Sequence, residues 1–168
     1  FENRIRYPLE IFKAIRDEIS SDYPIGVRFS ATDWVESSSW NIEEATKFAL
    51  KLKELGCDFF DVSSGGNSPK QNIISGPAYQ TGFASRIKSE VGIPTIAVGQ
   101  ITEPLQAESI ISTGQADLIA IGRGMLYNPR WAWHAAEVFK KEAAYPRQFA
   151  RSHHSLIGLP IPGNPQTK

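Results

Sequence analysis

The feature that most constrains the fold is a pattern repeated between Pro94 and Asn128, in which a short apolar run ends in a glycine turn. The first run, Thr95–Val98, precedes Gly99, and the second, Leu118–Ile121, precedes Gly122. Apolar runs without polar alternation are typical of parallel strands that are buried on both faces. The pattern therefore predicts two successive strands of a parallel sheet, each ending in a tight turn.

The same unit of strand and helix occurs twice more towards the N-terminus. Strands are predicted at Ile25–Ser30 and Asp58–Ser63, which are short runs rich in apolar residues. Amphipathic spacing, capping residues and breakers predict helices at Tyr7–Ser20, Asn41–Leu55, Tyr79–Glu90, Pro104–Gly114 and from Asn128 onward. Strands that alternate with helices in this way form a parallel sheet with right-handed crossovers.

Two parallel architectures fit this order. A doubly wound open sheet carries a glycine fingerprint after its first strand, and no G-x-G-x-x-G follows Ile25–Ser30. A (β/α)₈ barrel places its phosphate site after the seventh and eighth strands, and here the two glycine turns follow the last two strands. A complete barrel takes about 250 residues, and this chain has 168. The sequence therefore predicts an α/β fold that is the C-terminal half of a TIM barrel, with strands five to eight.

The predicted half-barrel covers residues 1–144, and a proline-rich, irregular tail follows at residues 145–168. The chain begins with Phe1 rather than with an initiator Met. We therefore expect it to be a fragment of a longer protein.

Composition argues against several classes of partner. Eighteen Lys and Arg residues balance eighteen Asp and Glu residues, so no net field attracts nucleic acid or anionic lipid. No apolar run approaches the roughly 18 residues that span a membrane, and we expect a soluble, cytoplasmic protein. Cys57, the single cysteine, is expected to be a structural thiol. No metal site is predicted, because the adjacent His153 and His154 have no second ligand pair nearby.

The two glycine turns are the strongest candidates for a binding site. Backbone amides freed at such turns, a helix N-terminus and one arginine together suit a phosphate dianion. The alternative is a helix-capping turn whose arginine pairs with a surface carboxylate. The candidate phosphate-binding residues are Val98, Gly99, Gln100, Gly122 and Arg123.

Two further candidates belong to the first predicted strand and the loop after it. Arg28 is conspicuous because a buried strand seldom holds an unpaired guanidinium. A buried ion pair with an acid such as Asp61 is the alternative to a role in binding. Trp34 lies in the loop that follows, on the same rim as the predicted phosphate site, and is a candidate substrate contact.

Five short motifs at characteristic spacing resemble one known family. The motifs are Phe1–Arg4 (FENR), Val27–Ala31 (VRFSA), Asp61–Gly65 (DVSSG), Ala97–Ile101 (AVGQI) and Ile119–Gly124 (IAIGRG). Over nearly its whole length the chain resembles the C-terminal half of the Old Yellow Enzyme family of FMN-dependent ene-reductases. It is most similar to the branch of bacterial NADPH dehydrogenases and xenobiotic reductases.

The resemblance implies an FMN site across the carboxyl ends of the strands. Arg28 would approach the flavin edge where negative charge accumulates on reduction, and the two glycine turns would hold the phosphate, with Arg123 as a charge-assisted fork. Hydride would pass from NADPH through FMN to an activated alkene such as an α,β-unsaturated carbonyl. The family's substrate-binding His pair or His/Asn pair and its proton-donating Tyr belong to the half that this chain lacks. No catalytic residue is therefore predicted here, and the isolated chain is expected to be inactive.

The resemblance also implies a subunit contact. Gln148–Arg151 is similar to a segment through which some family members place an arginine in a neighbouring active site. Arg151 is therefore a candidate substrate contact, and the full-length protein is expected to form a homo-oligomer.

Two functions from other classes remain open at this point. One is a flavin-free, phosphate-binding lyase or isomerase barrel. The other is a non-catalytic half-barrel that acts as an assembly module, whose exposed edge strands would require dimerisation or a partner.

Overall fold

The computed structural model describes residues 1–36, 40–143, 146 and 148–149. The chain divides into a first unit, Phe1–Trp131, and a second unit, Ala132–Lys168. Most of the predicted tail at residues 145–168 lies outside the described residues, so that boundary stays a prediction.

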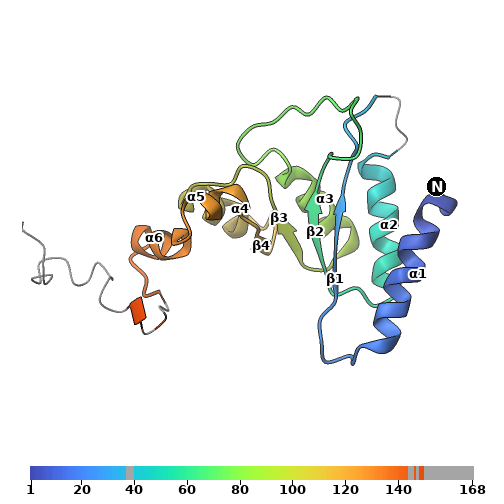
Figure 1. Cartoon of the computed structure of the whole chain (residues 1–168), viewed down its shortest axis with the longest axis horizontal. Coiled ribbons are helices and arrows are strands. Elements are labelled where there is room, and N and C mark those ends of the chain that lie inside the picture. Colours follow the sequence, from blue (N-terminus) through green and yellow to red (C-terminus); the bar gives the residue numbers. More distant parts are fainter. Residues whose placement is uncertain (37–39, 144–145, 147, 150–168) are drawn as a thin grey trace, which may run out of the picture. The chain divides into compact units, whose positions relative to one another are not determined.

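The first unit contains a four-stranded parallel sheet in the order β1-β2-β3-β4 (Figure 1). The strands are β1 Gly26–Ser30, β2 Phe59–Ser63, β3 Thr95–Ala97 and β4 Leu118–Ile119. Every neighbouring pair is parallel. The predicted alternation of parallel strands with helices is confirmed, and each strand lies within its predicted range.

Helices connect the strands and cover the core. They are α1 Glu2–Glu18, α2 Ile42–Glu54, α3 Thr81–Val91, α4 Pro104–Ser112 and the short α5 Arg123–Tyr127, while α6 Trp131–Val138 begins at the end of the first unit. Asn41 caps α2 by accepting a hydrogen bond from the Glu44 amide, as its sequence pattern predicts. In the second unit the Trp133 and Phe149 rings are in contact, with centroids 5.5 Å apart.

The start of α1 differs from the prediction, because the helix begins at Glu2 rather than at Tyr7 and holds Pro8 in its interior. Such a proline costs a helix about 3 kcal/mol. Packing offsets this cost, since Ile5 is fully buried. Arg4 also makes a two-pronged contact with Glu44 of α2, with nitrogen-to-oxygen distances of 2.8 and 2.6 Å.

The two faces of the sheet differ. One face packs against helices through buried side chains such as Phe60 and Val62, and the Phe29 ring meets Phe48 of α2 edge to face at 5.8 Å. On the other face, one row of register-aligned residues crosses all four strands, and its members are Arg28, Asp61, Ile96 and Leu118.

The prediction that the strands are buried on both faces is wrong for this second face. Leu118 is 56% exposed although it lies in an apolar run. The physical reason is its position, since β4 is an edge strand of the described sheet and no described helix covers the row that holds Leu118. A half-barrel leaves this inward face open.

Two aspartates hold the starts of the strands. Asp58 accepts a hydrogen bond from the Ile25 amide at 2.7 Å, and Asp117 accepts one from the Thr95 amide at 2.9 Å. Each aspartate thereby ties the beginning of its own strand to that of the preceding one. Lys88 of α3 also pairs with Asp117 at 2.9 Å.

No helix among residues 1–36, 40–143, 146 and 148–149 has both the length and the apolar character needed to cross a bilayer.

We predict that Asp117→Asn makes the stability of the chain less dependent on pH. The Thr95 amide, and then Lys88, hold the pKa of Asp117 below its ordinary value. The ionised carboxylate therefore stabilises the fold above about pH 4, and this contribution is lost as the pH falls through the pKa of the folded state. The variant should unfold at lower urea concentration than the native chain near pH 7, and the difference should shrink near pH 3.

Asp17→Asn is the matched control, because Asp17 forms an exposed pair with Lys13 on α1. It should change the free energy of unfolding far less. A destabilisation by Asp117→Asn that is equally large at both pH values would contradict the prediction.

Candidate functional site

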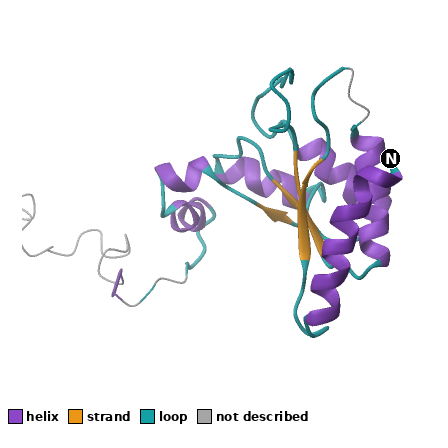
Figure 2. Ribbon diagram, turned by 45° about the vertical axis from the view of Figure 1, so that its right-hand side comes forward, coloured by secondary structure: helices purple, strands orange, loops and turns teal. Residues whose placement is uncertain are grey.

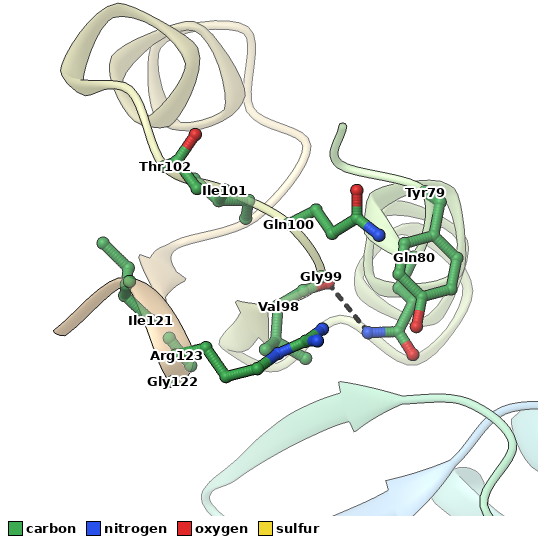
Figure 3. Close-up of a pocket in the computed structure, with 12 residues that line it drawn as sticks. Tyr79, Gln80, Val98, Gly99, Gln100, Ile101, Thr102, Ile121, Gly122 and Arg123 are labelled. Atoms are coloured by element: carbon green, nitrogen blue, oxygen red, sulfur yellow. Dashed lines mark hydrogen bonds between the residues drawn. The ribbon is translucent and has the colours of Figure 1, made fainter. Parts of the chain in front are cut away.

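The two glycine turns lie together in one pocket of about 370 Å³ at the carboxyl ends of β3 and β4 (Figure 3). The predicted phosphate-binding residues Val98, Gly99, Gln100, Gly122 and Arg123 all line it. The structure therefore brings together every residue of that candidate set. The sequence did not point to two other lining residues, Tyr79 and Gln80 at the start of α3.

The first turn requires glycine at position 99. Gly99 has φ of +122°, a conformation that side chains rarely adopt. A Cβ atom there would also lie only 2.8 Å from Gln80 Nε2 and 3.1 Å from the Tyr79 ring. The turn continues through Gln100, a non-glycine residue with φ of +51°. This backbone is closely fitted against the start of α3.

The second turn contains two glycines with different local constraints. Gly122 has φ of −88° and ψ of −94°, outside the regions that non-glycine residues usually occupy, although an added Cβ would meet nothing within 4 Å. At Gly124, by contrast, an added Cβ would lie 2.8 Å from the Ile121 side chain. Close packing against Ile121, two residues after the end of β4, is therefore the reason for glycine at position 124.

Arg123 supplies the positive charge of the pocket. Its side chain is exposed and extends from Gly122 toward the side of the pocket that holds Gly99 and Gln80 (Figure 3). Among the described residues, its guanidinium forms no ion pair with a carboxylate. The alternative of a capping turn with a surface ion pair is therefore not what the described structure contains. A free guanidinium beside two backbone turns suits a phosphate group.

Arg28 does not line this pocket. It lies on β1, the edge strand farthest from β4 in the described sheet. It forms an ion pair with Asp61 at 2.7 Å, which is the alternative that the sequence left open. The pair is not buried as a whole, because the Arg28 side chain is 58% exposed whereas that of Asp61 is 18% exposed. The second carboxylate oxygen, Asp61 Oδ1, is buried and has no hydrogen-bond partner among the described residues. The guanidinium is thus anchored at one side and accessible on the open face of the sheet.

The loops that follow β1 and β2 leave the same edge of the sheet (Figure 2), and Trp34 of the first loop contacts the second. Its indole nitrogen donates to Ser64 Oγ at 2.8 Å. Its ring meets Phe83 edge to face, with centroids 5.7 Å apart. Its role as a substrate contact stays a prediction, and Arg151 lies outside the described residues.

Cys57 is buried, and loss of solvation raises the pKa of its thiol to about 11. This places it among inert thiols rather than nucleophiles.

Comparison with known proteins connects this site to a family. The sequence profile of the NADH:flavin oxidoreductase / NADH oxidase family matches residues 1–142. The chain belongs to this family. Membership confirms the resemblance to Old Yellow Enzymes that the five motifs indicated.

Two relatives in the NADH:flavin oxidoreductase family illustrate the extent of the match. The chain is 40% identical over 141 residues to an NADH oxidase of Thermoanaerobacter brockii, covering 82% of this chain and 22% of that protein. It is 39% identical over 150 residues to an NADPH dehydrogenase of Geobacillus thermodenitrificans, covering 89% of this chain and 43% of that protein. The chain therefore spans less than half the length of these curated relatives.

A solved structure agrees with the family assignment. The chain superposes on a 2-naphthoyl-CoA reductase complex with a TM-score of 0.75 and 25% identity, covering 82% of this chain and 21% of that one. The described sheet and helices thus match part of the barrel of this family.

Of the two lining residues that sequence reasoning missed, Gln80 has the more defined contacts. It is 4% exposed, and its amide donates to the Val98 carbonyl at 3.1 Å. In the sequence it stands in the first turn of a predicted helix, where polar residues are usually solvated. No pattern in the sequence distinguishes it from such a residue.

We predict that Gly99→Ala destabilises the first unit by about 1–3 kcal/mol, because it adds a side chain at positive φ and against Gln80. The midpoint of urea unfolding measures the effect. Gly82→Ala in α3 is the control, since an added Cβ there meets nothing within 4 Å. Equal unfolding midpoints for Gly99→Ala and Gly82→Ala would show that the turn is not constrained as described.

Proposed function

We propose that this chain provides the phosphate-binding half of an FMN site in an oxidoreductase that takes hydride from NADPH and delivers it to an activated alkene. An α,β-unsaturated carbonyl is the substrate class we favour. The observation that carries the proposal is the meeting of the Gly99 turn and Arg123, which has no carboxylate partner among the described residues, in one pocket at the strand ends. Membership of a flavin oxidoreductase family and relatives named NADPH dehydrogenase support it.

The residues of the pocket suit the phosphate of FMN. The Arg123 guanidinium offers parallel N–H donors to phosphate oxygens, and Gly99 leaves the backbone of the turn without a side chain between it and a ligand. When bound, FMN would supply the hydride chemistry, while the protein binds and orients it. Val98, Gly99, Gln100, Gly122 and Arg123 are the residues that would hold its phosphate.

Arg28 suits a second role towards the same cofactor. Its exposed guanidinium is held by Asp61, which lies beside it in the row that crosses the second face of the sheet. A fixed cation there would favour negative charge on a reduced flavin ring. Asp61 orients the guanidinium from one side, leaving the other donors of Arg28 for a ligand.

The remaining elements of the proposal concern the full-length protein. Trp34 and Arg151 would contact substrate, and the protein would be a cytoplasmic homo-oligomer. Family membership disfavours a flavin-free lyase or isomerase. The open sheet face and the exposed edge strands β1 and β4 suit completion of a barrel by further strand and helix units.

Arg123→Gln should remove the preference of the chain for FMN over riboflavin, which lacks the phosphate. We expect the native chain to bind FMN more tightly than riboflavin. The variant should lose about tenfold to a hundredfold in FMN affinity, the value of a charge-assisted contact, while its riboflavin affinity stays unchanged. Titration followed by flavin fluorescence measures both affinities.

Two variants serve as controls for that experiment. Arg6→Gln removes an equal charge from α1, outside the residues that line the pocket, and should preserve the preference. Arg28→Gln should weaken FMN and riboflavin binding alike, because Arg28 is assigned to the ring and not to the phosphate. If the native chain binds the two flavins equally, or binds neither, the proposal is refuted.

The purified 168-residue chain should show no sustained oxidation of NADPH in the presence of FMN and an enone. The four described strands border only half of a barrel mouth, and the family's proton donor is expected in the other half. A spectrophotometric assay of NADPH consumption tests this, with the NADPH dehydrogenase of Geobacillus thermodenitrificans as the positive control. Repeated turnover by the chain alone would show that the described half is sufficient.

A further inference from the structure

A line of hydrogen bonds joins three loops at the carboxyl edge of the sheet. Trp34 Nε1 donates to Ser64 Oγ at 2.8 Å, Ser64 Oγ donates to Gln80 Oε1 at 2.6 Å, and Gln80 Nε2 donates to the Val98 carbonyl at 3.1 Å. We call these four residues the Gln80 network. It runs from the loop after β1, through the loop after β2 and the start of α3, to the Gly99 turn.

The chemistry of the network permits only one orientation. The indole nitrogen of Trp34 can only donate, and the Val98 carbonyl can only accept. Ser64 must therefore accept from Trp34 and donate onward, and the amide of Gln80 must turn its oxygen to Ser64 and its nitrogen to Val98. Because Gln80 is buried, loss of either bond would leave a polar group without a partner.

Positive φ angles at non-glycine residues, which strain the backbone, occur at or near the same residues. Four non-glycine residues in the described part of the chain have positive φ, and three of them belong to this region. Trp34 is a member of the network, while Ala78 and Gln100 each lie two positions from one. Such conformations cost about 1–3 kcal/mol each and persist only where surrounding contacts hold them. The Gln80 network is the set of contacts that spans these three positions.

Gln80 also shapes the Gly99 turn by occupying space. A Cβ atom added at position 99 would lie only 2.8 Å from Gln80 Nε2. Since C=O and N–H of a trans peptide point in opposite directions, holding the Val98 carbonyl on Gln80 directs the Gly99 amide away from Gln80. Figure 3 shows this bond at the border of the pocket that also holds Arg123.

We propose that Gln80 is the positioning residue of the anion site, fixing the Gly99 turn and coupling its occupancy to Trp34 on the substrate side. This inference rests on the proposed function, because it assumes that the turn binds phosphate. Gln80 acts through the backbone of Val98 and Gly99. Through this coupling, the affinity of the Gly99 turn for phosphate would depend on the conformation of the loop after β1.

The test uses the native 168-residue chain labelled with ¹⁵N, with inorganic phosphate as the probe. Phosphate should shift the amide signals of Gly99 and Arg123 and also the indole signal of Trp34. Gln80→Met keeps the length and apolar bulk of the side chain but removes both hydrogen bonds. It should weaken phosphate binding about tenfold, the equivalent of one net hydrogen bond, and abolish the response of the Trp34 indole.

A second variant separates the two parts of the role. Ser64→Ala breaks the link between Trp34 and Gln80 but leaves the bond from Gln80 to Val98. It should abolish the response of Trp34 while keeping phosphate affinity close to native. A purely structural role of Gln80 would not produce this separation.

Gln115→Met is the matched control, because the Gln115 side chain donates to the nearby Thr113 hydroxyl and Gln115 does not line the pocket. It should leave both readouts unchanged. Native phosphate affinity and a native Trp34 response in Gln80→Met would overturn this inference and leave the proposed function standing. Absence of phosphate binding by the native chain would refute the proposed function and, with it, this inference.

Discussion

Parallel pairing of the four strands is the constraint on which the rest of the structure depends. It brings all the carboxyl ends to one edge of the sheet, so turns separated by more than 20 positions in the sequence come to line one pocket. Asp58 and Asp117 reinforce the pairing at the other edge, where each carboxylate binds the amide that begins the preceding strand. The site is thus a direct consequence of strand direction.

The open face of the sheet links the fold to its family. Arg28, Asp61, Ile96 and Leu118 form one row across the strands, and its chemistry changes from charged at β1 to apolar at β4. Beside the exposed Arg28, the partly buried Asp61 has one buried carboxylate oxygen, Oδ1, without a described partner. Such an oxygen is costly unless a further group reaches it, which is in keeping with a chain that spans less than half the length of its relatives.

In the proposed site, Arg123 would supply the charge that attracts the anion, and the Gln80 network would hold the backbone that positions it. As an exposed side chain, Arg123 would define the position of the anion only loosely. The Gly99 turn would define position, and we propose that its conformation depends on Gln80, a residue from another βα unit. Sites of this kind need a supporting layer that is buried and fully hydrogen-bonded, because a partly satisfied polar network destabilises the fold.

The sequence by itself determined the order of strands and helices, the parallel sheet and the pairing of the two glycine turns, because apolar periodicity and glycine positions are local properties. Only the tertiary structure decided that α1 extends through Pro8, since the compensation comes from burial of Ile5 and from the contact of Arg4 with Glu44 of α2. It also decided that Leu118 stays exposed and that Gln80 is buried. Burial and hydrogen-bond partners of single side chains depend on segments far away in the sequence, which no local pattern records.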